Sequence, residues 1–352
     1  MKRLIAWVGA LMLGGSLLAG VVSAQQSSGP SLPREELTQQ QQQRTVQQPY
    51  NNAPMWKEAR GAVQGYSSIP APEAGVLIQD GGQNWRALRN GKVSVIGGWA
   101  LVVMALVVAA FYMWRGTIQL HEAPSGRMLP RFSVVERMAH WTTAITFCVL
   151  AVSGLIMAFG KTLLIPVFGF TLFSWLAIIA KNLHNFLGPL FVLSCTATFV
   201  VFVRDNMPKL VDLKWIASFG GLFSDGHVPS EKFNAGEKVW FWGGVTVLGL
   251  VVGVSGLVLN FPNFGQTRAT MQIASLVHLA GAVLFMLGAL GHIYMGTLGV
   301  AGAYGAMKTG EVDEVWAKEH HEIWYHQVKA KATQQQPQSP PHGKPAIAGG
   351  DD

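Results

Sequence analysis

Histidines inside apolar segments are the residues of this sequence best placed to do chemistry. Four of the ten histidines lie in or at the edge of long apolar segments: His140, His184, His278 and His292. An ionisable side chain in such a segment is costly and indicates a functional site. For any one of these histidines alone, a structural hydrogen-bonding role is an equally good reading.

The spacing of two of these histidines indicates a shared function. His278 and His292 are 14 residues apart in one apolar segment. Fourteen residues are close to four helical turns, so both side chains leave about the same face of a helix, ~21 Å apart along its axis. A helix that crosses a membrane would therefore carry one histidine near each side.

Long uncharged segments supply helices of that kind. Half of the residues are hydrophobic and only 13% are charged, whereas soluble proteins carry about 25% charged residues. Each uncharged segment exceeds the ~20 residues that cross the hydrocarbon core. The segments, which contain no Lys, Arg, Asp or Glu, are 93–114, 138–160, 182–203, 239–267 and 269–307. We predict an all-α integral membrane protein, a four-helix transmembrane bundle over 129–307 preceded by one extra N-terminal transmembrane helix at 93–114.

The remaining segments are predicted from composition. Residues 1–24 have the pattern of a signal peptide, with Lys2 and Arg3 before an apolar stretch and Val22-Ser23-Ala24 as the cleavage site; the alternative is an uncleaved anchor helix. Residues 25–92 are rich in Gln, Pro, Ser and Gly, which predicts a disordered periplasmic tail. Residues 162–180 are predicted to be interfacial or partly re-entrant because Pro166 and Gly169 interrupt them. Residues 308–352 are predicted as a cytoplasmic helix and disordered tail.

The distribution of positive charge predicts the orientation. With the N-terminal tail in the periplasm, the inner segments carry 14 Lys and Arg residues and the short outer loops carry three. This asymmetry follows the positive-inside rule and favours a multi-pass protein of the bacterial inner membrane with a cytoplasmic C-terminus. The formal charge of +7 is then membrane-flanking charge, and we expect lipid but no nucleic acid as a partner.

The orientation sorts the four histidines into two layers. It places His140 with His292 on the inner side and His184 with His278 on the outer side. Two imidazoles from facing helices are the ligands of a bis-histidine haem iron, and bundle cores commonly hold such cofactors. The sequence therefore predicts a haem-binding bundle that holds two haems b, with the four histidines as ligands of the haem iron.

Small residues near the histidines have two readings. Gly188 and Gly281 lie about one turn after His184 and His278, where a haem plane needs a close approach to the backbone. Ser153-Gly154 and Ser255-Gly256 each lie in a Val-Ser-Gly-Leu sequence. For these two pairs, haem clearance and the helix packing that small residues allow in membranes remain equally good explanations.

Other classes of site fit the sequence less well. Zinc needs three or four close ligands, and the apolar segments offer two histidines per layer without carboxylates. Cys148 and Cys195 lie in apolar segments and are expected to be packed thiols, and the absence of Cys-x-x-Cys-His excludes covalent haem attachment. A transporter would need an acidic residue deep in a span, and none of the apolar segments contains one. A non-redox scaffold with structural histidines stays open.

An ordered set of short motifs resembles a known family. The motifs are 136–141 (ERMAHW), 183–186 (LHNF), 232–238 (KFNAGEK), 276–278 (LVH), 292–294 (HIY), 316–321 (WAKEHH) and 324–325 (WY). From about residue 129 to residue 328 the chain resembles the cytochrome b gamma subunit of membrane-bound formate dehydrogenases. The resemblance implies a respiratory chain subunit that reduces a quinone, without catalytic residues for formate oxidation, which takes place on another subunit.

The resemblance also implies a quinone site and partners. Menaquinone or ubiquinone would bind near the inner haem at Asn234, Gly236 and His292, although Asn234 also suits a helix cap. The partners would be a molybdenum or tungsten catalytic alpha subunit and an iron–sulfur beta subunit. The alternative is the cytochrome b subunit of a nickel–iron hydrogenase or another quinone-linked oxidoreductase. His320 and His321 are expected to be solvated or interface residues.

Overall fold

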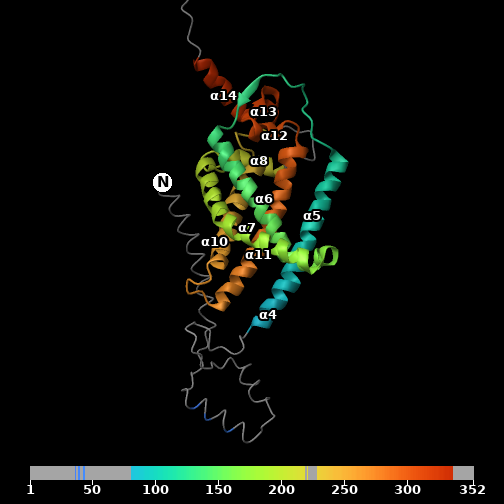
Figure 1. Ribbon diagram of the computed structural model, residues 1–352. Helices are drawn as coiled ribbons and strands as arrows, with labels where there is room; N and C mark the ends of the chain where they lie inside the picture. Colours follow the sequence, from blue (N-terminus) through green and yellow to red (C-terminus); the bar gives the residue numbers. More distant parts are fainter. Residues whose placement is uncertain are drawn as a thin grey trace, which may run out of the picture. The chain divides into compact units, whose positions relative to one another are not determined.

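The computed structural model describes residues 81–218, 220 and 228–335, with isolated positions at 36, 39 and 43 (Figure 1). The predicted signal peptide (1–24) lies outside the described residues. So do nearly all of the predicted tail up to residue 80 and the C-terminal tail after residue 335.

Five helical segments are long and apolar enough to cross a membrane, and they confirm the predicted architecture of one helix followed by four. The first three are α4–η2–α5 (Gly82–Ala87, Leu88–Val93, Ser94–Arg115), α6 (Val134–Leu163) and α7 (Ile165–Phe202). The last two are α9–η4–α10 (Ala235–Val239, Trp240–Leu248, Gly249–Asn260) and α11–η5 (Arg268–Tyr294, Met295–Gly299). Because a membrane solvates apolar side chains, large residues such as Ile96 and Trp99 can be exposed on α5.

The first helix begins earlier than its apolar residues indicate. The sequence placed a disordered tail up to residue 92, but the described chain is helical from Gly82. Its polar start is anchored to α11 by two hydrogen bonds. Trp85 Nε1 donates to the carbonyl of Gln272 (3.0 Å), and Arg89 Nε donates to Ser275 Oγ (3.0 Å). These contacts between distant segments are not visible in the composition of the tail.

Residues 162–180 are mostly helical and join the next span without a loop. Pro166 lies in the first turn of α7, where a missing N–H costs little. Gly169 has φ 72°, so the break lies at this glycine, and the chain after it is helical to Phe202. Whether this segment is interfacial or re-entrant stays a prediction.

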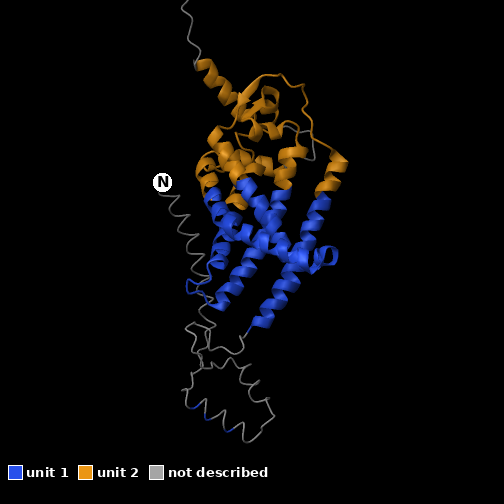
Figure 2. Ribbon diagram, viewed as in Figure 1, with its two compact units in different colours: residues 1–107, 143–195, 247–290 blue, residues 108–142, 196–246, 291–352 orange. Residues whose placement is uncertain are grey.

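The chain divides into two compact units (Figure 2). Unit 1 contains residues 1–107, 143–195 and 247–290, and unit 2 contains residues 108–142, 196–246 and 291–352. Helices α5, α6, α7 and α11 and the π-helical segment η4 contribute residues to both. In unit 1, Cys195 is buried as predicted. The prediction was wrong for Cys148, which is exposed, because an apolar segment can face lipid as well as the core.

Unit 2 folds the C-terminal segment that the sequence predicted only as helix and tail. Strand β2 (Glu311–Asp313) pairs antiparallel with β1 (Met128–Pro130), in a register that places Leu129 opposite Val312. Helices α8 (Leu210–Ala217), α12 (Ala303–Lys308), α13 (Glu314–His320) and α14 (Glu322–Gln335) complete the unit. Its buried core includes Trp316 and Trp324. Strands of three residues are too short for an alternating pattern, which explains why they were not predicted.

Candidate functional site

The structure brings the four histidines together as two pairs. In unit 1, His184 of α7 faces His278 of α11, with ring centroids 6.0 Å apart. In unit 2, His140 of α6 faces His292 of α11, with ring centroids 6.2 Å apart. These are the pairs that the sequence predicted from topology. Their role as haem ligands remains a prediction.

The separation within each pair fits one metal ion between two imidazoles. An imidazole nitrogen bonds a metal at about 2 Å and lies ~1.2 Å from its ring centre, so two imidazoles on opposite sides of one iron have centres roughly 6.4 Å apart. The observed separations of 6.0 and 6.2 Å are close to this value. Among the described residues, no three histidine, cysteine or acidic side chains form a group that could hold a metal ion. The arrangement therefore suits a haem iron, whose remaining ligands come from the porphyrin.

The rings of the unit 1 pair are held by serines. His184 Nδ1 lies 2.9 Å from Ser153 Oγ on α6. His278 Nδ1 lies 3.2 Å from Ser255 Oγ and 3.0 Å from the carbonyl of Val252, both on α10. With Nδ1 occupied on both rings, Nε2 is the nitrogen available to bind a metal. The sequence signal for these serines was the repeated Val-Ser-Gly-Leu, without the contact itself.

The unit 2 pair has different surroundings. His140 Nδ1 is buried and has no hydrogen-bond partner among the residues that the structure describes. The ring of Trp240 stacks on that of His292, with centroids 5.0 Å apart and 15° between the planes. Trp240 opens the π-helical segment η4, and His292 lies three residues before the π-helical segment η5. Such segments change side-chain directions and are frequent at functional sites.

The glycines near the histidines have separate roles. A Cβ atom on Gly188 would meet no atom within 4 Å, so space lies beside it. A Cβ atom on Gly281 would approach Val251 and Val252 to 3.1 Å, so this glycine permits packing against α10. Helix packing is thus one role of Gly281, and its predicted haem clearance stays a prediction.

A cluster of phenylalanines lies two helical turns from the histidines. Phe147, Phe191 and Phe285 each lie seven residues from one of the four histidines on the same helix. Within unit 1, the Phe285 ring lies 4.7 Å from that of Phe147 and 6.0 Å from that of Phe191. Phe191 and Phe285 are 4% and 3% exposed. The cluster therefore fills the core of unit 1 at helical positions that follow from those of the histidines.

The residues predicted to bind quinone have structural contacts of their own. Asn234 caps α9, because its Oδ1 accepts from Glu237 N (2.9 Å) while a Glu237 carboxylate oxygen accepts from Asn234 N (2.8 Å). A Cβ atom on Gly236 would lie 2.8 Å from the Trp215 ring, so this glycine admits the indole. The cap uses Oδ1, and the structure does not test the predicted contact with a quinone.

His321 is buried within the chain, so the expectation that it is a solvated or interface residue was wrong. It is 1% exposed and lies in unit 2. Its Nδ1 donates to the carbonyl of Glu231 (2.6 Å), and its Nε2 lies 3.0 Å from Arg131 Nη2. Burial first, and then the adjacent Arg131 guanidinium, lower the pKa of His321 to about 3. The ring is therefore neutral and structural at neutral pH.

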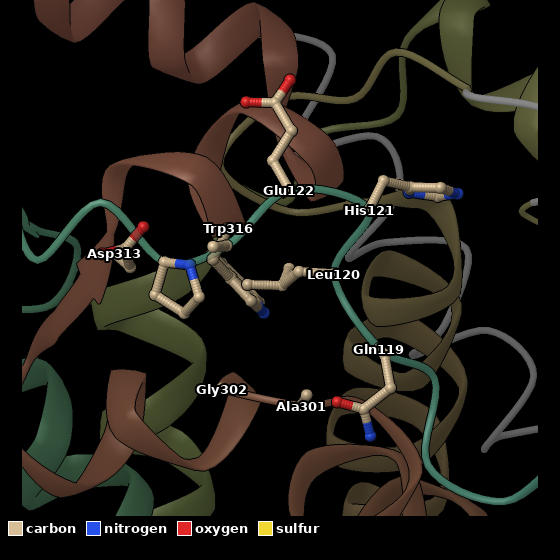
Figure 3. A pocket seen from close by; sticks show the side chains of 10 residues that line it. Gln119, Leu120, His121, Glu122, Ala301, Gly302, Asp313 and Trp316 are labelled. Carbon is tan, nitrogen blue, oxygen red and sulfur yellow. The ribbon is translucent and has the colours of Figure 1, made fainter.

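A separate pocket of about 320 Å³ lies in unit 2 (Figure 3). Leu120 and Glu122 of the loop before β1 line it, together with Gly302 and Trp316. In Figure 3 the Trp316 indole points into this space and the Glu122 carboxylate points away from it. The pocket contains none of the four histidines, so it is not part of the candidate site.

Paired imidazoles within a helical bundle that crosses the membrane several times define a class, the membrane cytochromes b. The family model of the prokaryotic cytochrome b561 matches residues 131–310, which include all four histidines. The chain belongs to this family, and as a cytochrome b it binds haem b.

Three similar proteins carry related names. The chain is 31% identical over 214 residues to the cytochrome b556(Fdn) subunit of the nitrate-inducible formate dehydrogenase of Escherichia coli, covering 58% of this chain and 94% of that protein. It is 30% identical over 208 residues to the cytochrome b556(fdo) subunit of an E. coli formate dehydrogenase, covering 56% and 92%. It is 27% identical over 206 residues to the formate dehydrogenase cytochrome b556 subunit of Haemophilus influenzae, covering 55% and 81%.

Proposed function

We propose that the chain is the cytochrome b (gamma) subunit of a respiratory formate dehydrogenase. It would carry electrons from an iron–sulfur subunit across the membrane to a quinone. The observation that carries the proposal is that the chain holds two histidine pairs and is similar to three formate dehydrogenase subunits over most of their length. The formate chemistry belongs to a molybdenum or tungsten catalytic subunit.

The two histidine pairs hold the cofactors in this proposal. His184 with His278 would hold one haem b through Nε2, and His140 with His292 would hold a second; each haem would supply a one-electron carrier. Ser153 and Ser255 orient the rings of the first pair. Trp240 lies against His292 of the second pair.

The direction of electron transfer follows from the proposed orientation of the chain in the membrane. The N-terminal tail is periplasmic, the C-terminus is cytoplasmic, and His184 with His278 form the outer pair. Electrons then enter from the periplasmic side and leave at the inner pair. The asymmetry of 14 inner against three outer positive charges supports this orientation.

The quinone site in the proposal lies at the inner pair. The Asn234 amide nitrogen donates a hydrogen bond to a quinone carbonyl, while its Oδ1 continues to cap α9. His292, the proposed inner ligand, stacks on Trp240, which lies six residues after Asn234 in the same helical segment. Gly236 lets the Trp215 ring lie close to the start of α9, so its part in the proposed site is to admit this indole.

An optical difference spectrum tests the electron donor. Membranes that contain the native complex are prepared without oxygen, and formate is added. We expect b-type haem to be reduced by formate and reoxidised by a soluble quinone analogue. If dithionite reduces the haem and formate does not, formate is not the donor. Hydrogen is then added to test the cytochrome b subunit of a nickel–iron hydrogenase, the alternative source of electrons.

A further inference from the structure

Each imidazole of the outer pair is held by a Ser-Gly pair on the helix that precedes its own. Ser153-Gly154 of α6 meets His184 of α7, and Ser255-Gly256 of α10 meets His278 of α11. The two serines are 3% and 6% exposed. The same four-residue sequence, Val-Ser-Gly-Leu, thus performs the same local task twice within unit 1.

The directions of the hydrogen bonds follow from the serine hydroxyls. Ser153 Oγ donates to the carbonyl of Leu150 (3.1 Å), and Ser255 Oγ donates to the carbonyl of Val251 (2.6 Å). A hydroxyl has one proton to donate, so each Oγ accepts from the imidazole. The proton of each ring is therefore on Nδ1, and the Nε2 lone pair is free for a metal.

The glycine of each pair permits the close approach of the ring. A Cβ atom on Gly154 would lie 3.4 Å from His184 Cε1, and one on Gly256 would lie 3.0 Å from His278 Cε1. Cε1 is the carbon between the two ring nitrogens, so the ring edge rests on the helix backbone. The serine fixes the rotation of the ring, and the glycine sets its distance from the helix.

The inner pair does not share this arrangement. His140 Nδ1 has no hydrogen-bond partner among the described residues. The difference matters because an acceptor at Nδ1–H makes an imidazole a stronger electron donor to its metal. Stronger donation favours the ferric over the ferrous state and lowers the reduction potential.

We propose that Ser153 and Ser255 are positioning residues that fix the tautomer of His184 and His278 and lower the potential of the outer haem relative to the inner one. This inference rests on the proposed haem ligation. The two serines have effects of similar size, because each ring also has a backbone hydrogen-bond partner on the preceding helix, Leu150 for His184 and Val252 for His278. A low outer potential and a higher inner potential would make transfer toward the inner side favourable.

The test is a redox titration of the haem absorbance in membranes with the native complex. For Ser153→Ala we expect the ferric-to-ferrous equilibrium of one haem to move about tenfold toward the ferrous state, an upward shift of about 59 mV for one electron. The other haem stays unchanged. Ser255→Ala moves the same component in the same direction by a similar amount, and Ser153→Thr, which keeps the hydroxyl, stays near the wild type. The low-spin ferric electron paramagnetic resonance signal should move with the potential.

Ser194→Ala is the matched control. Ser194 is buried in unit 1 and donates to the Phe191 carbonyl (2.9 Å), as Ser153 donates to the Leu150 carbonyl. Within the described part of the chain, it has no hydrogen bond to a histidine. We expect unchanged potentials for this variant.

Three results would overturn the inference. The first is an unchanged reduction potential of the outer haem in Ser153→Ala with both haems retained. The second is an equal shift of that potential in Ser153→Ala and Ser153→Thr. The third is a shift of that potential in Ser194→Ala. If Ser153→Ala loses one haem while Ser153→Thr keeps it, the hydroxyl is needed to hold the ligand, which supports the inference. If Ser153→Ala and Ser153→Thr both lose one haem, Ser255→Ala is the deciding variant. An unchanged reduction potential of the outer haem in Ser255→Ala then overturns the inference. The titration uses no formate, so a wrong electron donor in the proposed function would not alter it.

Discussion

Arg131 Nη2 lies 3.0 Å from Nε2 of His321, a residue that is 1% exposed to solvent. The guanidinium cannot accept a hydrogen bond, so it donates to an unprotonated Nε2. The Nδ1–H of the same ring donates to the Glu231 carbonyl at 2.6 Å. Arg131 also donates to the Glu237 carboxylate at 3.0 Å. The histidine is thus a neutral link between an arginine and the backbone of unit 2.

The first prediction concerns pH. The unfolded chain binds a proton at His321 near pH 6.5, whereas burial and Arg131 lower the native pKa to about 3, with Glu237 opposing them. Stability should therefore fall as the pH falls from 6.5 toward 3, by up to ~1.4 kcal/mol per pH unit. We expect His321→Gln, whose amide oxygen can accept from Arg131, to reduce this slope. Thermal unfolding in detergent at pH 7.5 and pH 5 would measure it, and an equal slope in both proteins would contradict the assignment.

The second prediction is that Arg131 is needed for the fold of unit 2. Its side chain is 4% exposed and pairs with Glu237. Removing Arg131 deletes charge-assisted hydrogen bonds to Glu237, which is itself 33% exposed, and to the buried His321 ring, at a cost of about 2–3 kcal/mol. We expect Arg131→Met to lower the unfolding free energy by this amount. Arg127→Met is the control, because Arg127 is 79% exposed in its pair with Glu314 and should cost less than ~1 kcal/mol.

The third prediction separates the two haem sites. His278→Ala should reduce the ratio of haem to protein from two to one and block electron entry, because the outer pair loses a ligand. His292→Ala should remove the other haem and stop quinone reduction while the outer haem still accepts electrons from formate. His121→Ala is the control, since His121 is 72% exposed in a pair with Glu319. Retention of both haems and normal quinone reduction in His278→Ala would show that this histidine is not a ligand.

The sequence predicted the histidine pairs because they depend on local geometry. The rise of a helix and the lengths of the apolar segments decide which histidine lies near which side of the membrane. The hydrogen bond from His184 to Ser153 depends on how two helices pack, 31 residues apart, so only the Val-Ser-Gly-Leu repeat hinted at it. The contact between Arg131 and His321 spans 190 residues and has no local signal. The same reason explains why the burial of His321 was missed.

The fourth prediction distinguishes the two roles of Asn234. Asn234→Ser keeps an oxygen that can cap α9 but removes the amide nitrogen, whereas Asn234→Ala removes both and should cost about 1 kcal/mol of stability. If the amide nitrogen donates to the quinone, Asn234→Ser should raise the KM for a quinone analogue about fivefold to tenfold with unchanged haem content. Steady-state quinone reduction would measure this. Normal kinetics in the serine variant, with a defect in the alanine variant alone, would leave capping as the whole role.

The last prediction concerns Phe285, which lies seven residues from both His278 and His292 on α11. Its ring is 3% exposed and packs 4.7 Å from that of Phe147. Phe→Ala substitutions in soluble cores cost about 3–5 kcal/mol, of which the transfer from water is one part and the cavity another. Because lipid replaces water as the surroundings of a membrane helix, mainly the cavity part remains, and we expect about 2–3 kcal/mol for Phe285→Ala.

The neighbouring residue supplies the control for this prediction. Leu284 is 55% exposed, so Leu284→Ala should change stability by less than ~0.5 kcal/mol. Unfolding in detergent, followed by circular dichroism and by haem absorbance, should show both haems of Phe285→Ala released at a lower temperature, because α11 carries a ligand of each pair. If the two variants unfold alike, the aromatic cluster does not hold the helices that present the histidines, and the ligand geometry must depend on the serine contacts and on the haems themselves.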